Sequence, residues 1–558
     1  MRKKSKPGDP FPALAIAGTH VVLLGWDYPA ASIRKDKVLG FAIERTRHSD
    51  GEVIWLPGMK TFEAVDPTPA PGVPVSSYKN PLQTFQWSDY TVDEVHEYTY
   101  RIVPRCGTPT ALKDGADVKL EVKTEGTQVG EHAVFFNRGA VASQEYARRF
   151  QNRTPDEVGQ AAFDWLSRGL IEGLEAYIKQ ADDGDELYGA FFEFKNKEIY
   201  TALREANDRG ATVKVLYDGK TQGDKNRDAM KGAGLGKMVK PRIHTGQFAH
   251  NKFLVLRKGD KSKQVWTGST NLSENGIYGH SNNAHIVRDS DIAEKYYEFW
   301  TLLNKDLTKK PTAEANDEAT PVPADPWDTE VVPVFSPQTE LGAMDWYADI
   351  AGKSERALFM TFAFGMNGRF VEVYERKDDV LRFALMEKKG NGKTMKQQSA
   401  EIDRIRKLPN TVVSVGHKVE LNNFDRWLEE IDRITKDQHV LYVHTKYMIS
   451  DPLGPNPVII VGSANFSDAS TITNDENMLV IQGNETLADI YLGEFMRLFS
   501  HYAFRESLSF KDNQSPAAAL LRKYLIDNPN WIDGERPSAN YFGKGTDRSL
   551  KRLYFSGQ

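Results

Sequence analysis

Short runs of β-branched and aromatic residues dominate the first 130 residues of the chain. Clusters of Gly, Pro and Asp separate these runs, a pattern typical of strands joined by tight turns. The runs cover residues 21–24, 39–44, 53–56, 84–87, 98–103 and 118–122. The pattern predicts an all-β sandwich over residues 1–130.

From about residue 131 the pattern alternates between strands and amphipathic helices. A strand over residues 188–194, a helix over 196–209 and a strand over 213–218 follow one another, the order typical of a parallel sheet. The same plan returns after residue 338. The chain is therefore predicted to be an α/β protein with two similar lobes, residues 131–310 and 338–508.

Two further segments complete the predicted organisation. Residues 311–337 are rich in Pro, Ala and acidic side chains, which favours an exposed, semi-extended interlobe linker. Residues 509–558 form a C-terminal tail that carries a predicted helix over 517–524 and ends basic and aromatic. The sequence leaves open whether the tail covers the lobes or flanks a cleft.

One polar phrase occurs twice, once in each lobe. The first copy contains His250, Lys252, Ser269 and Asn271, and the second contains His444, Lys446, Ser463 and Asn465. The differences 444 − 250, 446 − 252, 463 − 269 and 465 − 271 all equal 194. Apolar runs adjoin both parts of each phrase, so each copy predicts a β-hairpin that carries polar groups at one end. The exact register favours two half-sites that face each other across a pseudo-two-fold axis.

These residue types suit the cleavage of a phosphodiester. One imidazole can attack phosphorus while another protonates the leaving oxygen. The two lysines can neutralise the non-bridging oxygens, and the serines and asparagines can donate hydrogen bonds. This chemistry needs no metal, and the sequence offers no carboxylate cluster that would hold one. We expect no cofactor.

The duplicated phrase resembles the motif of the phospholipase D superfamily over about residues 135–510. The second copy matches with His444, Lys446 and Asp451, and Glu476 matches the acidic residue that supports the partner histidine in that family. The first copy departs from the motif, because Arg257 and Asn282 stand at the two acidic positions. The resemblance implies two phospholipase D-like α-β-α lobes and a phosphohistidine intermediate.

The same resemblance implies His250 as the nucleophile and His444 as the acid and base. The substitutions Arg257 and Asn282 suggest an altered environment for His250, and Arg257 is expected to join the lysines in a positive cleft. The other histidines of the two lobes are expected to be structural: His244, His280, His285, His417 and His439. The stretches 85–90 and 97–103 resemble the late strands of a fibronectin type III-like sandwich, which favours a spacer or interaction module.

Composition narrows the cellular context. Of the 558 residues 40% are hydrophobic and 27% are charged, and the net charge is −5, as in ordinary soluble proteins without a global basic field. The single cysteine, Cys106, excludes an internal disulfide and fits a reducing compartment. Neither a signal peptide nor a membrane span is recognised. We therefore expect a cytoplasmic protein without stable membrane insertion.

Three functions remain open from the sequence. A metal-independent nuclease acting on nucleic acid is favoured, and the range of the family makes bacterial defence one context for it. The alternative is a phospholipase D that hydrolyses or transfers phosphatidyl groups of phospholipid. The third is a non-catalytic binding protein with a degenerate site. One chain can supply both half-sites, while a regulatory protein partner or a homo-oligomer stays open.

Overall fold

The computed structural model describes residues 1–68, 73–139, 143–390, 395–416, 443–509, 524–535 and 539–558. Within these residues the chain is a mixed α/β protein whose N-terminal part is all β. Two of the histidines expected to be structural, His417 and His439, lie outside the described residues. The same holds for most of the helix predicted over 517–524.

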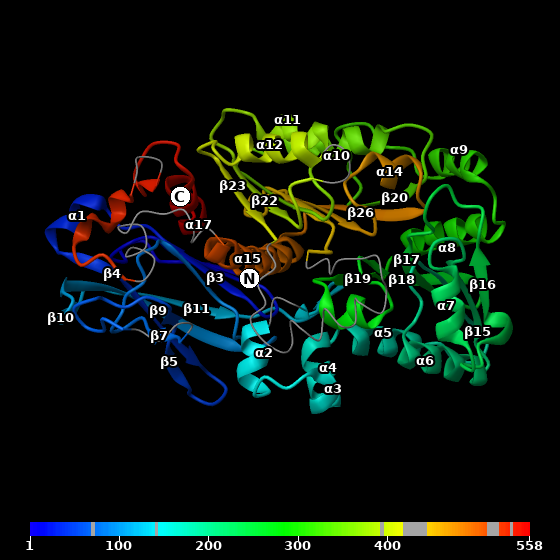
Figure 1. Cartoon of the computed structure of the whole chain (residues 1–558), viewed down its shortest axis with the longest axis horizontal. Helices are drawn as coiled ribbons and strands as arrows, with labels where there is room; N and C mark the ends of the chain where they lie inside the picture. The colour runs from blue at the N-terminus through cyan, green and yellow to red at the C-terminus, as the bar shows by residue number, and fades with distance from the viewer. Residues whose placement is uncertain (69–72, 140–142, 391–394, 417–442, 510–523, 536–538) are drawn as a thin grey trace.

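Two larger antiparallel sheets and the two-stranded pair β6 (Pro57–Gly58) and β7 (Val75–Ser76) form the N-terminal part, coloured blue in Figure 1. One sheet has the order β1 (Arg2–Lys4), β2 (Ala13–Ala17), β3 (Val22–Trp26) and β8 (Gln86–Asp89). The other has the order β10 (Ala111–Asp114), β9 (Glu97–Thr108), β4 (Val38–Arg47) and β5 (Val53–Trp55), and β11 (Val118–Lys123) also pairs with β9. Alternating side chains bury one face of β11, and such faces close a separate apolar core between the sheets.

The first lobe is built on a mixed sheet. Its strand order is β12 (Gln128–Val129), β13 (His132–Phe136), β19 (Asn283–Val287), β18 (Lys261–Gly268), β17 (Lys252–Lys258), β14 (Asp185–Phe191), β15 (Thr212–Asp218) and β16 (Val239–Arg242). Strands β14, β15 and β16 are parallel, whereas β17 runs antiparallel to β14. The predicted hairpin is β17 and β18, so the first copy of the phrase lies at one end of this sheet.

The second lobe repeats this arrangement. Its sheet has the order β20 (Val331–Ser336), β26 (Glu476–Gln482), β25 (Val458–Gly462), β24 (Tyr447–Ser450), β21 (Ala357–Phe362), β22 (Leu381–Met386) and β23 (Thr411–Val415). The register repeats as well. Leu254 lies opposite Trp266 in the first hairpin, and Met448 lies opposite Ile460 in the second, and both residues are displaced by 194. The relation of the lobes by a two-fold axis stays a prediction.

Helices cover the faces of both sheets (Figure 1). Those of the first lobe are α2 (Ser143–Arg149), α3 (Pro155–Val158), α4 (Gln160–Ser167), α5 (Leu170–Ile178), α6 (Lys197–Asp208), α7 (Gly223–Met230) and α8 (Ser290–Asn304). Those of the second are α10 (Gly342–Gly352), α11 (Gly368–Tyr374), α12 (Met395–Ile405), α14 (Asp468–Ile472) and α15 (Glu485–Ser509). Residues 156–180 carry the apolar spacing of one long helix, but Gly159 and Gly169 adopt φ of 83° and 84°. This left-handed backbone ends a helix, so three short helices form instead.

The predicted exposed linker over residues 311–337 is ordered at both ends, whereas residues 321–330 between them have no helix or strand and are mostly exposed. This segment contains α9 (Lys309–Ala319), which buries Thr312, Ala313 and Asn316, followed by β20. The apolar run at 331–335 pairs with β26 and becomes an outer strand of the second lobe's sheet. Pairing and burial of these apolar residues outweigh the Pro- and acid-rich composition that favoured an extended chain.

The described part of the C-terminal tail packs against the β-domain and also contacts the second lobe, where the centroid of the Tyr554 ring lies 6.2 Å from that of Phe359. Trp531 donates from Nε1 to the carbonyl oxygen of Val38 at 3.0 Å, and α17 (Asp547–Ser556) lies against β3. A Cβ atom on Gly25 would come within 2.1 Å of the Phe555 carbonyl oxygen, so only glycine permits this approach. Trp531, Tyr554 and Phe555 of the tail are therefore buried residues of the protein core, with exposures of at most 4%.

The two lobes contact each other directly through their polar loops. Isolated bridges join Ala249 to Asp475 and Ser281 to Val443. These bridges are equivalent, because 443 − 249 and 475 − 281 both equal 194. Arg242 donates from Nε to Asp475 Oδ2 at 3.0 Å across the same interface. Helix α15 adds a second contact between the lobes, since Glu494 accepts a hydrogen bond from Arg168 of the first lobe at 2.6 Å.

The buried ion pair between Arg242 and Asp475 gives a test of the interface. Both side chains are at most 2% exposed, and burial raises the pKa of Asp475 to about 6 although Arg242 opposes the shift. Arg242→Met keeps most of the volume but leaves Asp475 without its partner. We expect a loss of about 3–5 kcal/mol in unfolding free energy in urea titrations. Arg34→Met, which removes an exposed pair with Asp533, is the control and should cost less than about 1 kcal/mol. Equal losses in the two variants would contradict this role of Arg242.

Candidate active site

The two copies of the phrase meet between the lobes. Each histidine precedes a central strand and each lysine lies two residues later, so both side chains of a pair point to the same face. The rings of His250 and His444 are buried, with relative exposures of 9% and 5%. Lys252 and Lys446 are buried as well, and each donates from Nζ to the carbonyl oxygen of its own histidine, at 2.6 Å and 2.5 Å.

A side chain from the second lobe holds His250. The Nδ1 atom of His250 lies 2.8 Å from Glu476 Oε2, which also accepts from Ser463 Oγ at 2.7 Å. Asn474 donates to the other carboxylate oxygen at 3.1 Å. The carboxylate accepts only, so Nδ1 carries a proton and Nε2 is left for a substrate. The ring of Phe192 packs against His250 with centroids 4.8 Å apart.

A side chain from the first lobe holds His444 in the equivalent way. The Nδ1 atom of His444 lies 2.8 Å from Asn282 Oδ1, which also accepts from Ser269 Oγ at 2.8 Å. The amide of Asn282 donates to the carbonyl oxygen of Gly276 at 2.7 Å. A carbonyl oxygen only accepts, and this fixes which end of the amide faces His444. His444 is therefore protonated on Nδ1 and has a free Nε2 lone pair.

These contacts correct the expectation that Asn282 alters the surroundings of His250. Each supporting residue acts on the histidine of the other lobe, so His250 keeps a carboxylate partner, and His444 is the histidine with a neutral amide. A comparison of residues within one lobe cannot detect a hydrogen bond that a side chain makes to the other lobe.

Electrostatics show that the four basic side chains converge. Burial lowers the pKa of His250 to about 4, against the opposing effect of Glu476. Burial lowers the pKa of His444 well below its usual value, and Lys446, Lys252 and His250 lower it further. Burial likewise lowers the pKa of Lys252 to about 8. Such a cluster of buried basic groups favours an anionic ligand, because the ligand's charge stabilises their protonated forms.

The remaining residues of the phrase complete the cleft. Ser269 and Ser463 are fully buried and donate to the supports Asn282 and Glu476, so their hydroxyls orient those supports. The Oδ1 atoms of Asn271 and Asn465 are buried without a hydrogen-bond partner. The two serines are thus positioning residues. Each of the two asparagines keeps an unused acceptor oxygen that a ligand can contact.

Asp451 and Arg257 do not join the cleft, contrary to expectation. Asp451 follows the far end of β24 and accepts from the backbone N–H groups of Glu355, Arg356 and Ala357 at 2.7–2.9 Å. Its role is to hold the loop before β21. Arg257 likewise lies at the far end of β17, where it pairs with Glu186 and Glu294. A strand advances about 3.3 Å per residue, so both positions are roughly 20 Å of chain beyond the histidines.

His280 was expected to be structural, but it lies at the site. Its ring centroid is 5.3 Å from that of His444, and both ring nitrogens are buried without a partner. The repeat contained a signal for His280. Its equivalent in the second copy is Asn474 (280 + 194 = 474), whose amide donates to Glu476. His285 is structural as expected, held by Tyr491 and His132. His244 is an exposed residue that contacts Asp306.

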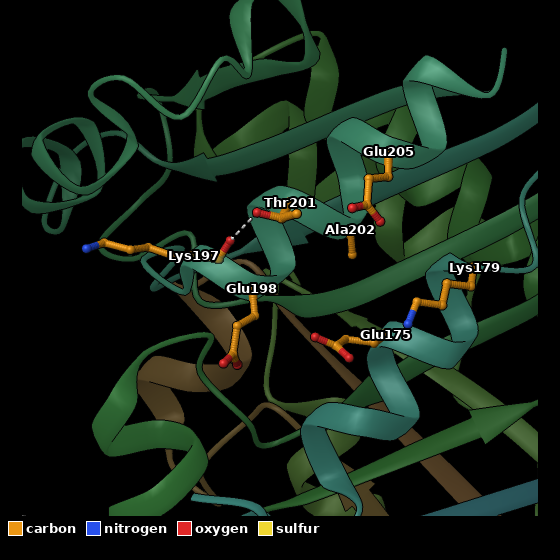
Figure 2. A pocket seen from close by; sticks show the side chains of 7 residues that line it. All are labelled: Glu175, Lys179, Lys197, Glu198, Thr201, Ala202 and Glu205. Atoms are coloured by element: carbon orange, nitrogen blue, oxygen red, sulfur yellow. Dashed lines mark hydrogen bonds between the residues drawn. The ribbon is translucent and has the colours of Figure 1, made fainter. Parts of the chain in front are cut away.

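A separate hollow lies on the outer surface of the first lobe. Figure 2 shows it between α5 and α6. Its volume is about 360 Å³. Its lining is Glu175, Lys179, Lys197, Glu198, Thr201, Ala202 and Glu205. None of these residues belongs to the duplicated phrase. In the part of the chain that the structure describes, no group of three His, Cys, Asp or Glu side chains could hold a metal ion.

Comparison with known proteins connects both copies to one domain family. Residues 174–303 and 400–499 match a family model described as cardiolipin synthase, PLD-like domain, and these segments include both copies of the phrase. Curated relatives named phospholipase D are found in Rickettsia typhi and Rickettsia conorii. They are 27% identical over 129 residues and 28% identical over 127 residues. Each match covers 22% of this chain and 58% of the relative, so the chain spans less than two thirds of their length.

The solved structures that match this chain include two proteins of different names. Phosphatidylserine synthase of Haemophilus influenzae Rd KW20 is 11% identical, and the match covers 70% of this chain and 91% of that chain with a TM-score of 0.41. The phospholipase D family member Nuc of Salmonella typhimurium is 15% identical, and the match covers 31% and 94% of the two chains with a TM-score of 0.22.

The lowered pKa of Lys252 predicts pH-dependent anion binding. Its amine is charged below about pH 8 and neutral above it. Binding of sulfate, whose charge is constant in this range, should weaken by up to about tenfold per pH unit between pH 8 and 9.5, because the amine must first take up a proton. Isothermal titration calorimetry measures this, and Lys252→Met should bind weakly without the same decline. Equal wild-type affinity at pH 7 and 9.5 would contradict it.

Proposed function

We propose that this chain is a phosphodiesterase of the phospholipase D superfamily that works through a phosphohistidine intermediate. The observation that carries the proposal is the pair of histidines held on Nδ1 by side chains of the opposite lobe, with two lysines beside them. The catalytic residues are His250, His444, Lys252 and Lys446. Matches of both segments to a PLD-like domain model support the assignment.

The reaction has two balanced steps. In the first, Nε2 of one histidine attacks phosphorus, the bond from phosphorus to the leaving oxygen breaks, and the other histidine gives its Nε2 proton to that oxygen. In the second, the now neutral histidine takes a proton from water, the oxygen attacks phosphorus, and the phosphorus–nitrogen bond breaks. Lys252 and Lys446 neutralise the phosphoryl oxygens in both steps.

We favour nucleic acid as the substrate. A hollow of about 110 Å³ lies beside the site and is lined by Asn465, Ser467 and Phe364 among others. Phe364 is 37% exposed, and the Lys388 ammonium lies 5.5 Å from its ring centroid. An exposed aromatic ring with a cation beside a phosphate site suits the stacking of an unpaired base. The reaction would be that of a metal-independent endonuclease, with bacterial defence as one setting.

Phospholipid is the second candidate substrate, and the names of the matched relatives favour it. The family model and the curated relatives carry the names cardiolipin synthase and phospholipase D. No helix in the described residues is long and apolar enough to cross a membrane. A binding protein with a degenerate site is the third candidate, and the intact support of both histidines argues against it.

The proposed domains are the β-sandwich over residues 1–130, the two lobes, and a tail docked on the sandwich. The order β2, β3, β8 in one sheet and β5, β4, β9, β11 in the other supports a fibronectin type III-like assignment. This domain is the proposed contact surface for a regulatory partner or a second copy, and a cytoplasmic location remains our proposal.

The proposed activity predicts cleavage in EDTA that depends on His444. Wild-type protein should cut labelled single-stranded DNA or RNA, and His444→Ala should be slower by at least about 100-fold, because a reacting imidazole is lost. His244→Ala is the matched control, since this exposed histidine lies outside the site, and it should keep wild-type activity. Gel assays follow the cleavage of the labelled strands and of duplex DNA. Choline release from phosphatidylcholine vesicles is measured in parallel.

The outcomes separate the candidates. Choline release without cleavage of nucleic acid would replace the nuclease with the phospholipase. Inactivity on all of these substrates would contradict the proposed function and favour the binding protein.

A further inference from the structure

The supports of the two histidines differ in charge although they occupy equivalent positions. Asn282 and Glu476 are 194 residues apart, and each accepts from the Nδ1 atom of a histidine at 2.8 Å and from a serine hydroxyl. One is a neutral amide and the other a carboxylate. We propose, resting on the proposed function, that His444 is the nucleophile and His250 is the general acid and base. This is the reverse of the assignment that the resemblance implies.

The reaction needs one proton, and the location of that proton decides the two roles. Before attack, one imidazole must be protonated to act as the acid, and the other must be neutral to act as the nucleophile. The imidazolium form of His250 gains a charge-assisted hydrogen bond with Glu476. The imidazolium form of His444 would gain only a hydrogen bond to an amide oxygen. A single proton shared by the two residues therefore resides on His250.

The groups that face each ring lead to the same conclusion. His444 is surrounded by Lys446, His280, Lys252 and His250, and none of these can carry a negative charge. His250 faces both lysines too, but the carboxylate of Glu476 opposes them. Coulombic interaction at these distances favours the charged form where the carboxylate lies.

His280 strengthens this asymmetry. It stands at the position equivalent to Asn474, whose amide donates to Glu476. Because Asn282 directs its own amide to Gly276, the first lobe needs no donor at residue 280. The freed position holds an imidazole 5.3 Å from His444 instead. Burial lowers the pKa of His280 to about 4, so this neutral ring offers no negative charge that would stabilise a proton on His444.

The first lobe also fixes the nucleophile in a reactive tautomer. Asn137 donates to the carbonyl oxygens of Ile277 and His280 and accepts from the backbone N–H of Asn282. Residues 275–279 form a π-helical turn, a feature frequent at functional sites. This frame orients the amide of Asn282, which holds the proton of His444 on Nδ1 and leaves the Nε2 lone pair toward the cleft. The neutral form is thus prepared before substrate arrives.

The leaving group distinguishes the two roles. Bis(p-nitrophenyl) phosphate releases a stable phenolate and does not need an acid, whereas a nucleic-acid alkoxide does. His250→Ala should release about one p-nitrophenol per chain in a rapid burst, followed by slow turnover, because the phosphoryl group remains on His444. The same variant should cleave labelled DNA slower by about 100- to 10,000-fold. His444→Ala should give no burst. Thermal unfolding of both variants confirms that they are folded.

A burst in His444→Ala together with none in His250→Ala would overturn the inference. If neither variant shows a burst, wild-type enzyme quenched in alkali during turnover decides by mass spectrometry of its peptides. A phosphoryl adduct on His444 supports the inference, and an adduct on His250 overturns it. Wild-type protein that is inactive on every phosphodiester would instead show that the proposed function has failed.

Discussion

Each histidine of the proposed active site depends on a hydrogen bond that crosses from one lobe to the other. The bonds from His250 to Glu476 and from His444 to Asn282 fix both ring orientation and tautomer, which a loop histidine cannot achieve alone. The first lobe without the second would lose the support of His250, and the second without the first would lose that of His444. The site therefore exists only when the lobes are docked, and their interface is part of its chemistry.

The rest of the structure maintains that docking. The bridges from Ala249 to Asp475 and from Ser281 to Val443 place each support beside the opposite histidine. Arg242 and Asp475 form a buried ion pair beside the first bridge. On the other side, Arg497 of α15 donates to the carbonyl oxygen of Asn137 at 2.9 Å, and Asn137 in turn frames Asn282. The linker segment contributes as well, since β20 joins the sheet of the second lobe and pairs with β26, which begins at Glu476.

The sequence predicted what is periodic and missed what depends on contacts between distant segments. Strand and helix alternation located the sheets of both lobes, and the duplicated phrase located the histidines, lysines and asparagines that the structure brings together. Asp451 and Arg257 were misplaced because a motif position gives no information about which end of a strand a residue occupies. His280 was missed because its meaning lies in a comparison with Asn474. The ordered ends of the linker and the docking of the tail on the β-domain were missed because composition cannot reveal a docking partner.

A count of covalent phosphoryl groups tests the central claim, one active site shared by two lobes, most directly. Enzyme mixed with excess phosphorus-labelled diester and quenched in alkali at early times should carry at most one acid-labile phosphoryl group per chain. Intact-protein mass spectrometry measures this stoichiometry. One group per chain at saturation is the result that a single composite site predicts. Two groups per chain would mean that each lobe reacts independently, and that result would contradict a single site shared between the lobes.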